Sequence, residues 1–253
     1  MTMWELYDEL IEGIDPSATA DKIIRGAYQT LVISGEGYGI CNTMDDTWRP
    51  SVLPSKSLGM PLRDLAACVK SWNFSEASIG LAALNAWYNE KSRLKASGVE
   101  VSDLRHTEDR TNDPFITYQR DVRGKTVTVV GHFPYIEQLF APVCTLRIIE
   151  KFMPKDGDYP EQAAEYLLPE SDFVFISSYT FVEKQLPRYL ELSRGAKVTL
   201  VGPATTMAPQ LARYGIADLS GFVVKDFPAA ERVALGLAGE NFHSLGQKIS
   251  MRF

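Results

Sequence analysis

One stretch of the sequence, VTVVGHFPYIEQL at residues 127–139, ends an apolar, strand-forming run on a glycine, as a dinucleotide-binding unit would. A phosphate-binding loop would continue with glycines, but His132, Phe133 and Pro134 follow Gly131 instead. Imidazole titrates nearest to neutral pH, so His132 could act as a general base, a proton donor or a metal ligand. A structural histidine bonded to backbone is the alternative. The Phe133 ring could stack on a planar heterocycle or pack against neighbouring loops.

Three carboxylates stand where they could contact a ligand. Asp158, in KFMPKDGDYP, could bind a cation or a ligand's hydroxyl and amino groups, or it could belong to a polar turn. Glu150 follows Gly131 by 19 positions, near the spacing at which an acidic side chain binds ribose in nucleotide folds. A strand-end carboxylate in an ion pair would look the same. In GEGYG, Glu36 and Tyr38 could reach over a cleft, or the segment could simply turn.

Hydroxyl and amide side chains form the other candidate group. Ser177 and Ser178 stand beside a predicted helix start, where they could cap the helix or bind an anion. Asn85 lies inside an apolar helical run and needs a hydrogen-bond partner if it is buried. In VGPATTMAP, hydroxyls and backbone amides could converge on a polar atom or only cap a helix. The candidates there are Gly202, Pro203, Thr205 and Thr206.

The second part of the chain, residues 112–253, predicts the sheet that would position most of these groups. Helical segments alternate there with five near-continuous apolar, strand-like segments: TVTVVG, TLRIIE, DFVFISS, AKVTLVG and DLSGFVV. This alternation is typical of a parallel sheet covered on both faces, as in Rossmann-like domains. Ligands of such sheets bind outside the carboxyl ends of the strands, where Gly131, Glu150, Ser177 and Gly202 stand.

The first part, residues 1–100, predicts an α+β arrangement. WELYDELIEGI has apolar residues at helical spacing, KIIRGAYQTLVIS is expected to form one strand, and GICNTM is its expected hairpin partner. Two helices follow, PLRDLAACVKSW and SEASIGLAALNAWYN, with Ser75 as the predicted N-cap of the second. The polar segment 90–112 lacks sustained periodicity and is predicted to be the linker.

The composition narrows the class of protein. The 253 residues are 45% hydrophobic, and a net charge of -6 argues against a nucleic-acid partner. The acidic N-terminal segment does not resemble a signal peptide, and no apolar run is long enough for a membrane, so we expect a cytoplasmic protein. Three scattered cysteines and three histidines argue against a Cys/His metal centre, which leaves a divalent cation held by oxygen ligands open. The motifs of serine hydrolases, zincins and P-loop proteins are absent from the sequence.

Several stretches together resemble a bacterial and archaeal family associated with heavy-metal chelation: SWNFSEASIGLAALNAWYN, VVGHFPYIEQL, PKDGDYPEQAAEYLLPESDFVFISSYTFVEK and LVGPATTMAPQLARYGIADLSGFVV. The resemblance covers nearly the whole chain. It implies a domain similar to the enolase N-terminal fold over residues 1–100, then a Rossmann-like domain over residues 112–253, with one cleft between them. The positions that match the family's motifs are Gly131, Phe133, Pro134, Gly157, Asp158, Pro160, Gly202, Pro203 and Thr205, with Asn85 in the matching helix.

Two positions lie outside this match. Glu183 stands where the family pattern would have an amide side chain, and His132 occupies a variable position. The resemblance therefore adds nothing to a catalytic role of His132.

The function that the resemblance implies is heavy-metal chelation, or making or breaking a pterin-, flavin- or siderophore-like molecule. We expect a small-molecule ligand in the interdomain cleft, with Glu36 or Asp158 as acid or base if the protein condenses or hydrolyses it. The alternatives are a non-catalytic metal or metallophore binding module and, on the spacing of Glu150, an S-adenosylmethionine-dependent methyltransferase. The cofactor is undetermined, with a divalent metal ion left open, and a homodimer stays open as the assembly.

Overall fold

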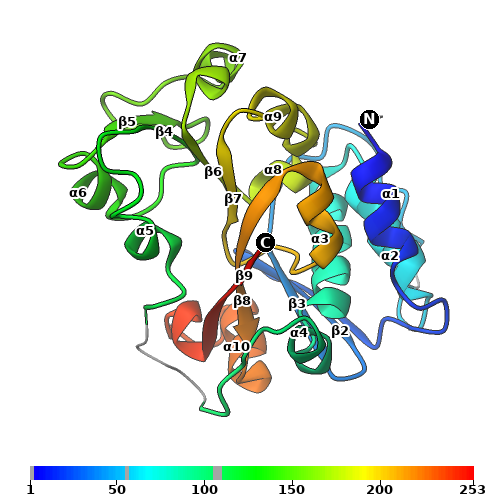
Figure 1. The fold of residues 1–253 in the computed structure, drawn as a ribbon. Helices are drawn as coiled ribbons and strands as arrows, with labels where there is room; N and C mark the ends of the chain where they lie inside the picture. The colour runs from blue at the N-terminus through cyan, green and yellow to red at the C-terminus, as the bar shows by residue number, and fades with distance from the viewer. Residues whose placement is uncertain (1–2, 55–56, 105–109) are drawn as a thin grey trace.

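The computed structural model of the chain describes residues 3–54, 57–104 and 110–253. The described residues form two sheets, a three-stranded antiparallel sheet and a six-stranded, mostly parallel sheet. Figure 1 shows the helices α1, α2 and α3 of the N-terminal part lying beside the large sheet, with β2 and β3 near the lower end of α3 in this view. This architecture confirms the predicted α/β class, in which an α+β part precedes a Rossmann-like part.

The N-terminal part corrects two expectations. Its elements are α1 (Glu5–Glu12), β1 (Lys22–Arg25), β2 (Gln29–Ser34), β3 (Gly37–Asn42), α2 (Leu62–Ala67), the 3-10 helix η1 (Cys68–Lys70), α3 (Phe74–Tyr88) and α4 (Lys91–Ala96). The segment predicted as one strand is a hairpin, because the chain turns back between β1 and β2. Gly26 lies in that turn, where a Cβ would come within 1.9 Å of the Ala234 carbonyl oxygen. The predicted linker contains the helix α4, and its residues 105–109 lie outside the described ranges.

Helix α3 is buried on nearly every side, and its small residues let other backbones approach closely. The strand β3 lies directly against it, since a Cβ on Gly39 would come within 1.8 Å of the Ala82 carbonyl oxygen. The expected N-cap is wrong: the Asn73 side chain accepts a hydrogen bond from the Glu76 N–H, and Ser75 lies inside the helix. Asn73 is the residue with the extended backbone that precedes a helix.

The large sheet has the strand order β5-β4-β6-β7-β8-β9. Its strands are β4 (Thr126–Val130), β5 (Thr145–Ile149), β6 (Phe173–Ser177), β7 (Lys197–Val201), β8 (Ile216–Val224) and β9 (Gly246–Arg252). The five predicted strands are confirmed and run parallel, while the antiparallel β9 was not predicted. The helical elements of this part are α5 (Pro114–Thr117), α6 (Ile136–Phe140), η2 (Glu161–Ala163), α7 (Ala164–Leu167), η3 (Leu168–Glu170), α8 (Tyr179–Val182), α9 (Leu186–Leu192), η4 (Pro209–Tyr214), α10 (Phe227–Ala234) and η5 (Phe242–Leu245).

Both faces of the large sheet are covered, as the near-continuous apolar strands predict. Figure 1 shows α5 and α6 on one side of the sheet, and α3, α8 and α9 on the other. Successive side chains follow this division: Val129 and Phe175 pack in the cluster with α5 and α6, whereas Val174 and Ile176 pack in the cluster with α3. No helix within the described ranges has the length and apolar character needed to span a bilayer.

One apolar core joins the two parts of the chain. The largest cluster of buried side chains includes residues from α1, α2 and α3 together with residues of the large sheet. Polar contacts also cross between the parts, such as the Tyr7 hydroxyl donating to the Phe181 carbonyl at 2.9 Å. The buried Lys184 donates from Nζ to the Ser71 carbonyl at 2.5 Å. The division into domains 1–100 and 112–253 therefore stays a prediction, since packing is continuous across it.

Candidate functional site

A cavity of about 1150 Å³ lies where the carboxyl ends of β4, β5, β6 and β7 face the end of β3. In the large sheet β4 lies between β5 and β6, and the connections after β4 and β6 leave in opposite directions, to β5 on one side and to β7 on the other. Open α/β sheets bind their ligands at such a switch point. Of the residues predicted for the site, those that line the cavity are Gly131, His132, Phe133, Pro134, Glu150, Ser177, Ser178, Gly202 and Pro203.

Two glycines bring the strand ends close to two serines of the cavity lining. Gly131 has a φ of 98°, and a Cβ there would lie 3.1 Å from the Cβ of Ser177. Gly202 has a φ of 137°, and a Cβ there would lie 2.4 Å from Oγ of Ser178. A side chain at either glycine would therefore strain the backbone and displace a serine from the cavity wall.

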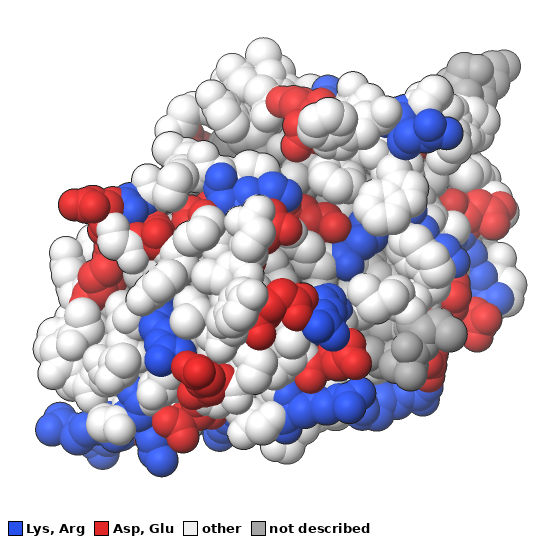
Figure 2. Space-filling view, turned by 90° about the horizontal axis from the view of Figure 1, so that it is seen from above, with Lys and Arg blue, Asp and Glu red and all other residues white. Residues whose placement is uncertain are grey.

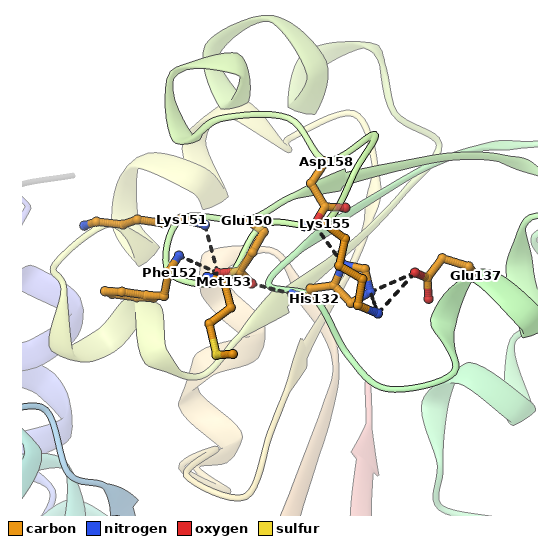
Figure 3. A network of polar contacts seen from close by, with 8 residues as sticks. All are labelled: His132, Glu137, Glu150, Lys151, Phe152, Met153, Lys155 and Asp158. Carbon is orange, nitrogen blue, oxygen red and sulfur yellow. Dashed lines mark hydrogen bonds and ion pairs between the residues drawn. The ribbon is translucent and has the colours of Figure 1, made fainter.

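His132 and Asp158 are brought together although 26 positions separate them. The His132 Nδ1 atom lies 2.9 Å from Oδ2 of Asp158, and both side chains are more than nine-tenths buried. On the other side of the ring, Nε2 lies 2.9 Å from the Glu137 carboxylate and 2.5 Å from Nζ of Lys155 (Figure 3). Asp158 lies behind His132 and does not line the cavity. The pairing fixes the orientation of the imidazole.

The Glu150 carboxylate binds backbone rather than open space. Its Oε2 accepts the His132 N–H at 2.7 Å, and its Oε1 accepts the N–H groups of Lys151, Phe152 and Met153 at 2.8, 2.7 and 3.3 Å (Figure 3). Burial works against the charge of Glu150, but these donors outweigh it and lower the pKa of the carboxyl group. Both carboxylate oxygens therefore accept backbone N–H groups and link the loops after β4 and β5. This arrangement does not support the predicted contact between Glu150 and a ribose.

A second charged group lines the cavity around Lys151. Its Nζ lies 2.9 Å from Oε1 of Glu183 and 3.3 Å from Oε2 of Glu161. Burial raises the pKa of Glu183, and the ion pair with Lys151 offsets only part of this. The pKa of Lys151 is also raised, because the two carboxylates outweigh its burial. The exposed fractions explain both shifts. The Glu183 side chain is only 6% exposed, so burial dominates its pKa, whereas that of Lys151 is 42% exposed, so the neighbouring carboxylates dominate its pKa.

Asn85 is fully buried, and both its NH2 group and its carbonyl oxygen are hydrogen-bonded. Its Nδ2 donates to the Ile40 carbonyl at 2.8 Å and to the Ala204 carbonyl at 2.9 Å, and its Oδ1 accepts the Thr206 hydroxyl at 2.7 Å. One turn further along α3, Asn89 donates from its side chain to the Thr205 carbonyl at 3.0 Å. These amides hold the loop after β7 against α3. Asn85, Thr205 and Thr206 therefore stand behind the cavity wall and outside its lining.

Glu36 and Tyr38 lie away from the cavity. Glu36 is exposed in the turn between β2 and β3, and Tyr38 stacks on Phe227 with ring centroids 4.6 Å apart. The cavity contacts β3 at its opposite end, around Cys41 and Asn42. The expectation that GEGYG covers the cleft fails in this structure, because the strand presents its other end to the large sheet.

Several lining residues were missed by the sequence reasoning. Asn42 is the last residue of β3 and lines the cavity. Its side chain donates to the Tyr179 hydroxyl, and this hydrogen bond joins the small sheet to α8. Phe152 and Met153 lie on the loop after β5, close to predicted residues, and their apolar character in a polar loop was the available signal. The contribution of Asn42 carried no local signal.

The donor groups around the cavity do not fit a resident metal ion. Among the described residues, no group of three or more His, Cys, Asp or Glu side chains is arranged to hold one. The cysteine at the site, Cys41, is buried, and burial raises the pKa of its thiol to about 12, so it stays protonated at neutral pH. Any metal bound here would need most of its ligands from another molecule.

Comparisons with known proteins place the chain among relatives without an assigned activity. Residues 113–252 match the DUF364 family and residues 7–88 match the DUF4213 family, both with the description "Putative heavy-metal chelation". A DUF364 protein of unknown function from Desulfitobacterium hafniense has a crystal structure that is similar over 99% of both chains, with 46% identity and a TM-score of 0.91.

Two more distant proteins also match. A DUF364 protein of unknown function from Pyrococcus horikoshii shares the fold over 100% of both chains, with 18% identity and a TM-score of 0.79. An uncharacterised protein of Methanocaldococcus jannaschii is 25% identical over 174 residues, which are 67% of this chain. The match spans 62% of the length of that relative.

Proposed function

The chain belongs to the DUF364 family, whose description is heavy-metal chelation, and from this premise we propose that it binds a small metal-chelating molecule in the cavity between its two sheets. The ligand would be a flat, polar compound of the pterin, flavin or siderophore kind. The observation that carries the proposal is the composition of the cavity wall, which offers many contacts to a small molecule and, within the described part of the chain, no ready set of metal ligands.

The size and position of the cavity support a small molecule. Its volume of about 1150 Å³ is just above the range typical of small-molecule sites. Its wall combines aromatic rings such as Phe133 and Tyr189 with hydroxyl and amide groups from several elements. Such a wall can bury a planar ring and orient its polar edge.

The charge of the wall favours a neutral or cationic ligand. Its described residues include the two ammonium groups of Lys151 and Lys155 and a larger set of carboxylates, namely Asp45, Asp46, Glu150, Glu161 and Glu183. Figure 2 shows acidic and basic side chains lying next to one another on the face seen from above. A chelator that carries its own cation would be less negative than the free chelator, so it would enter such a site more readily.

A titration of the purified protein with metal and chelator tests the proposal. Zinc chloride, 8-hydroxyquinoline, pterin and 2,3-dihydroxybenzoate are added singly and as zinc–chelator mixtures, and binding is followed by calorimetry. We expect saturable binding at one site for at least one chelator or its complex, and no stoichiometric binding of zinc alone. Tight one-to-one binding of zinc alone, with no chelator bound, would instead establish the non-catalytic metal-binding alternative.

A hydrolytic or condensing step on the bound molecule is a second candidate. The observation in its favour is the His132 and Asp158 pair, in which Nδ1 is fixed and Nε2 could exchange a proton with a ligand once Lys155 and Glu137 move aside. Mass spectrometry of the same mixtures after incubation would detect a converted chelator. Conversion that disappears in His132→Gln while binding remains would support this step, and unchanged conversion would exclude His132 from it.

A further inference from the structure

The loop after β5 carries two large apolar side chains that are exposed to solvent at the wall of the cavity. Phe152 is 52% exposed and Met153 is 82% exposed, and both line the cavity. Adjacent exposed apolar side chains beside a cavity are a feature of binding surfaces, and thioether and aromatic groups are common in them. We therefore expect these two side chains to contact a bound molecule.

The backbone of this loop is nevertheless firmly held. The three consecutive N–H groups of Lys151, Phe152 and Met153 converge on one oxygen of Glu150, while the other oxygen holds the loop after β4. The Lys151 side chain ties the same loop to Glu183. The backbone that carries the two apolar side chains is thus fixed, and the Lys151 ammonium lies 5.3 Å from the centroid of the Phe152 ring. A fixed backbone lowers the entropy lost when a ligand binds.

We propose that Phe152 and Met153 form a preformed apolar platform for the planar part of the ligand, and that Glu150 is the positioning residue that presents it. The inference rests on the proposed function and names a ligand feature, a flat aromatic or conjugated ring. Figure 3 shows Phe152 and Met153 on one side of Glu150, and His132 with its polar partners on the other. The ring would pack on the platform while its polar edge meets the hydroxyl and charged groups of the wall.

The position of the charge explains why a carboxylate is needed at residue 150. One oxygen accepts three neighbouring N–H groups, which a carboxylate can do because it carries only acceptors. In Glu150→Gln, an amide donor would face one of the two loops and repel its N–H groups. The amide oxygen can still accept the three N–H groups, but the NH2 group then faces the His132 N–H, so the loop after β5 loses its link to the loop after β4 and becomes more mobile while the strands stay intact.

The experiment is a mutant cycle with the zinc complex of 8-hydroxyquinoline as the fluorescent probe. We expect the double variant Phe152→Ala/Met153→Ala to weaken binding about tenfold, the effect of losing one good ring contact. Glu150→Gln should weaken binding by a similar factor, and adding it to the double variant should cause no further loss if it acts only through the platform. Tyr166→Ala removes an aromatic ring that is 76% exposed and outside the cavity lining, so it serves as the matched control.

Limited trypsin digestion measures the mobility of the loop after β5 without any ligand. Cleavage after Lys151 and Lys155 should be faster in Glu150→Gln than in the wild type, at equal thermal stability. Wild type that does not bind the probe counts against the proposed function. Wild type that binds, with the double variant unchanged, overturns the platform, and equal cleavage rates overturn the positioning role of Glu150.

Discussion

At the scale of single residues, a charged side chain can be buried by contacts with parts of the chain that are distant in sequence. Lys184 illustrates this, because its residue is only 8% exposed and its Nζ donates to the carbonyls of Ser71 and Val182. Its φ of 64° is rare for a residue other than glycine. Burial lowers the pKa of Lys184 to about 7. An isolated lysine between Glu183 and Gln185 gives no sequence signal of this environment.

The pKa of Lys184 predicts a pH dependence of stability. In the unfolded chain the amine keeps its proton to a pKa of about 10.4, so between pH 7 and that value the unfolded state binds more protons. The free energy of unfolding should therefore rise with pH over this window, by at most about 1.4 kcal/mol per pH unit. Lys184→Met keeps the apolar stem and should lack the rise.

Urea unfolding of both proteins between pH 6.5 and 9.5 measures this difference. The exposed Lys95→Met is the matched control and should follow the wild type. Parallel curves for the wild type and Lys184→Met would show that Lys184 keeps its proton in the folded state.

At the scale of elements, the sequence predicts which strand ends of the large sheet line the cavity, but it does not predict that the end of β3 faces them. Apolar strands alternating with helices predict a parallel sheet, and its topology alone brings Gly131, Ser177 and Gly202 to one edge. The pairing of His132 with Asp158 depends on the path of the loop after β5, which no periodic pattern encodes. Likewise, nothing local decides which end of β3 meets the large sheet. For that reason Glu36 was expected in the cleft, while the contribution of Asn42 was missed.

Helix α3 yields a prediction at this scale, because it links the two sheets through Asn85. Asn85→Ala would leave buried backbone and hydroxyl partners without hydrogen bonds on two sides of the helix. We expect the free energy of unfolding to fall by about 2–4 kcal/mol. Urea denaturation followed by circular dichroism measures it, with Gln162→Ala on an exposed position as control. A loss below about 0.5 kcal/mol, the range of ordinary surface substitutions, would contradict the role of Asn85 as a link.

At the scale of the whole molecule, the shared core predicts that both parts unfold together. The main apolar cluster includes side chains from Leu6 to Met251, so the described residues form one shared core on the α3 side of both sheets. The four tryptophans, at positions 4, 48, 72 and 87, all belong to the first 100 residues. Tryptophan fluorescence therefore reports on the first part and on its contacts with the second, such as that of Trp72 with Lys184, whereas far-ultraviolet circular dichroism reports on the secondary structure of both.

We expect the urea transitions measured by the two methods to coincide, as they do for a single cooperative unit. Fluorescence that changes at a lower urea concentration than circular dichroism would show that residues 1–100 unfold first. That outcome would turn the sequence boundary at residues 90–112 into a true boundary between independent domains.

The buried amide of Asn85 also has a consequence for how the protein is made. Its partner Ile40 precedes it in the chain, but its partner Ala204 follows it by 119 positions, so α3 leaves the ribosome long before the loop after β7 exists. Until that loop arrives, β2, β3 and α2 can cover part of α3, because they precede it in the chain, but the side of the helix that faces the large sheet has no partner. Contacts this distant in sequence form slowly, and bare apolar helices favour aggregation. We therefore expect the nascent chain to be most prone to aggregation between the synthesis of α3 and that of β7, and the wall of the cavity, which includes His243, is complete only when nearly the whole chain has been made.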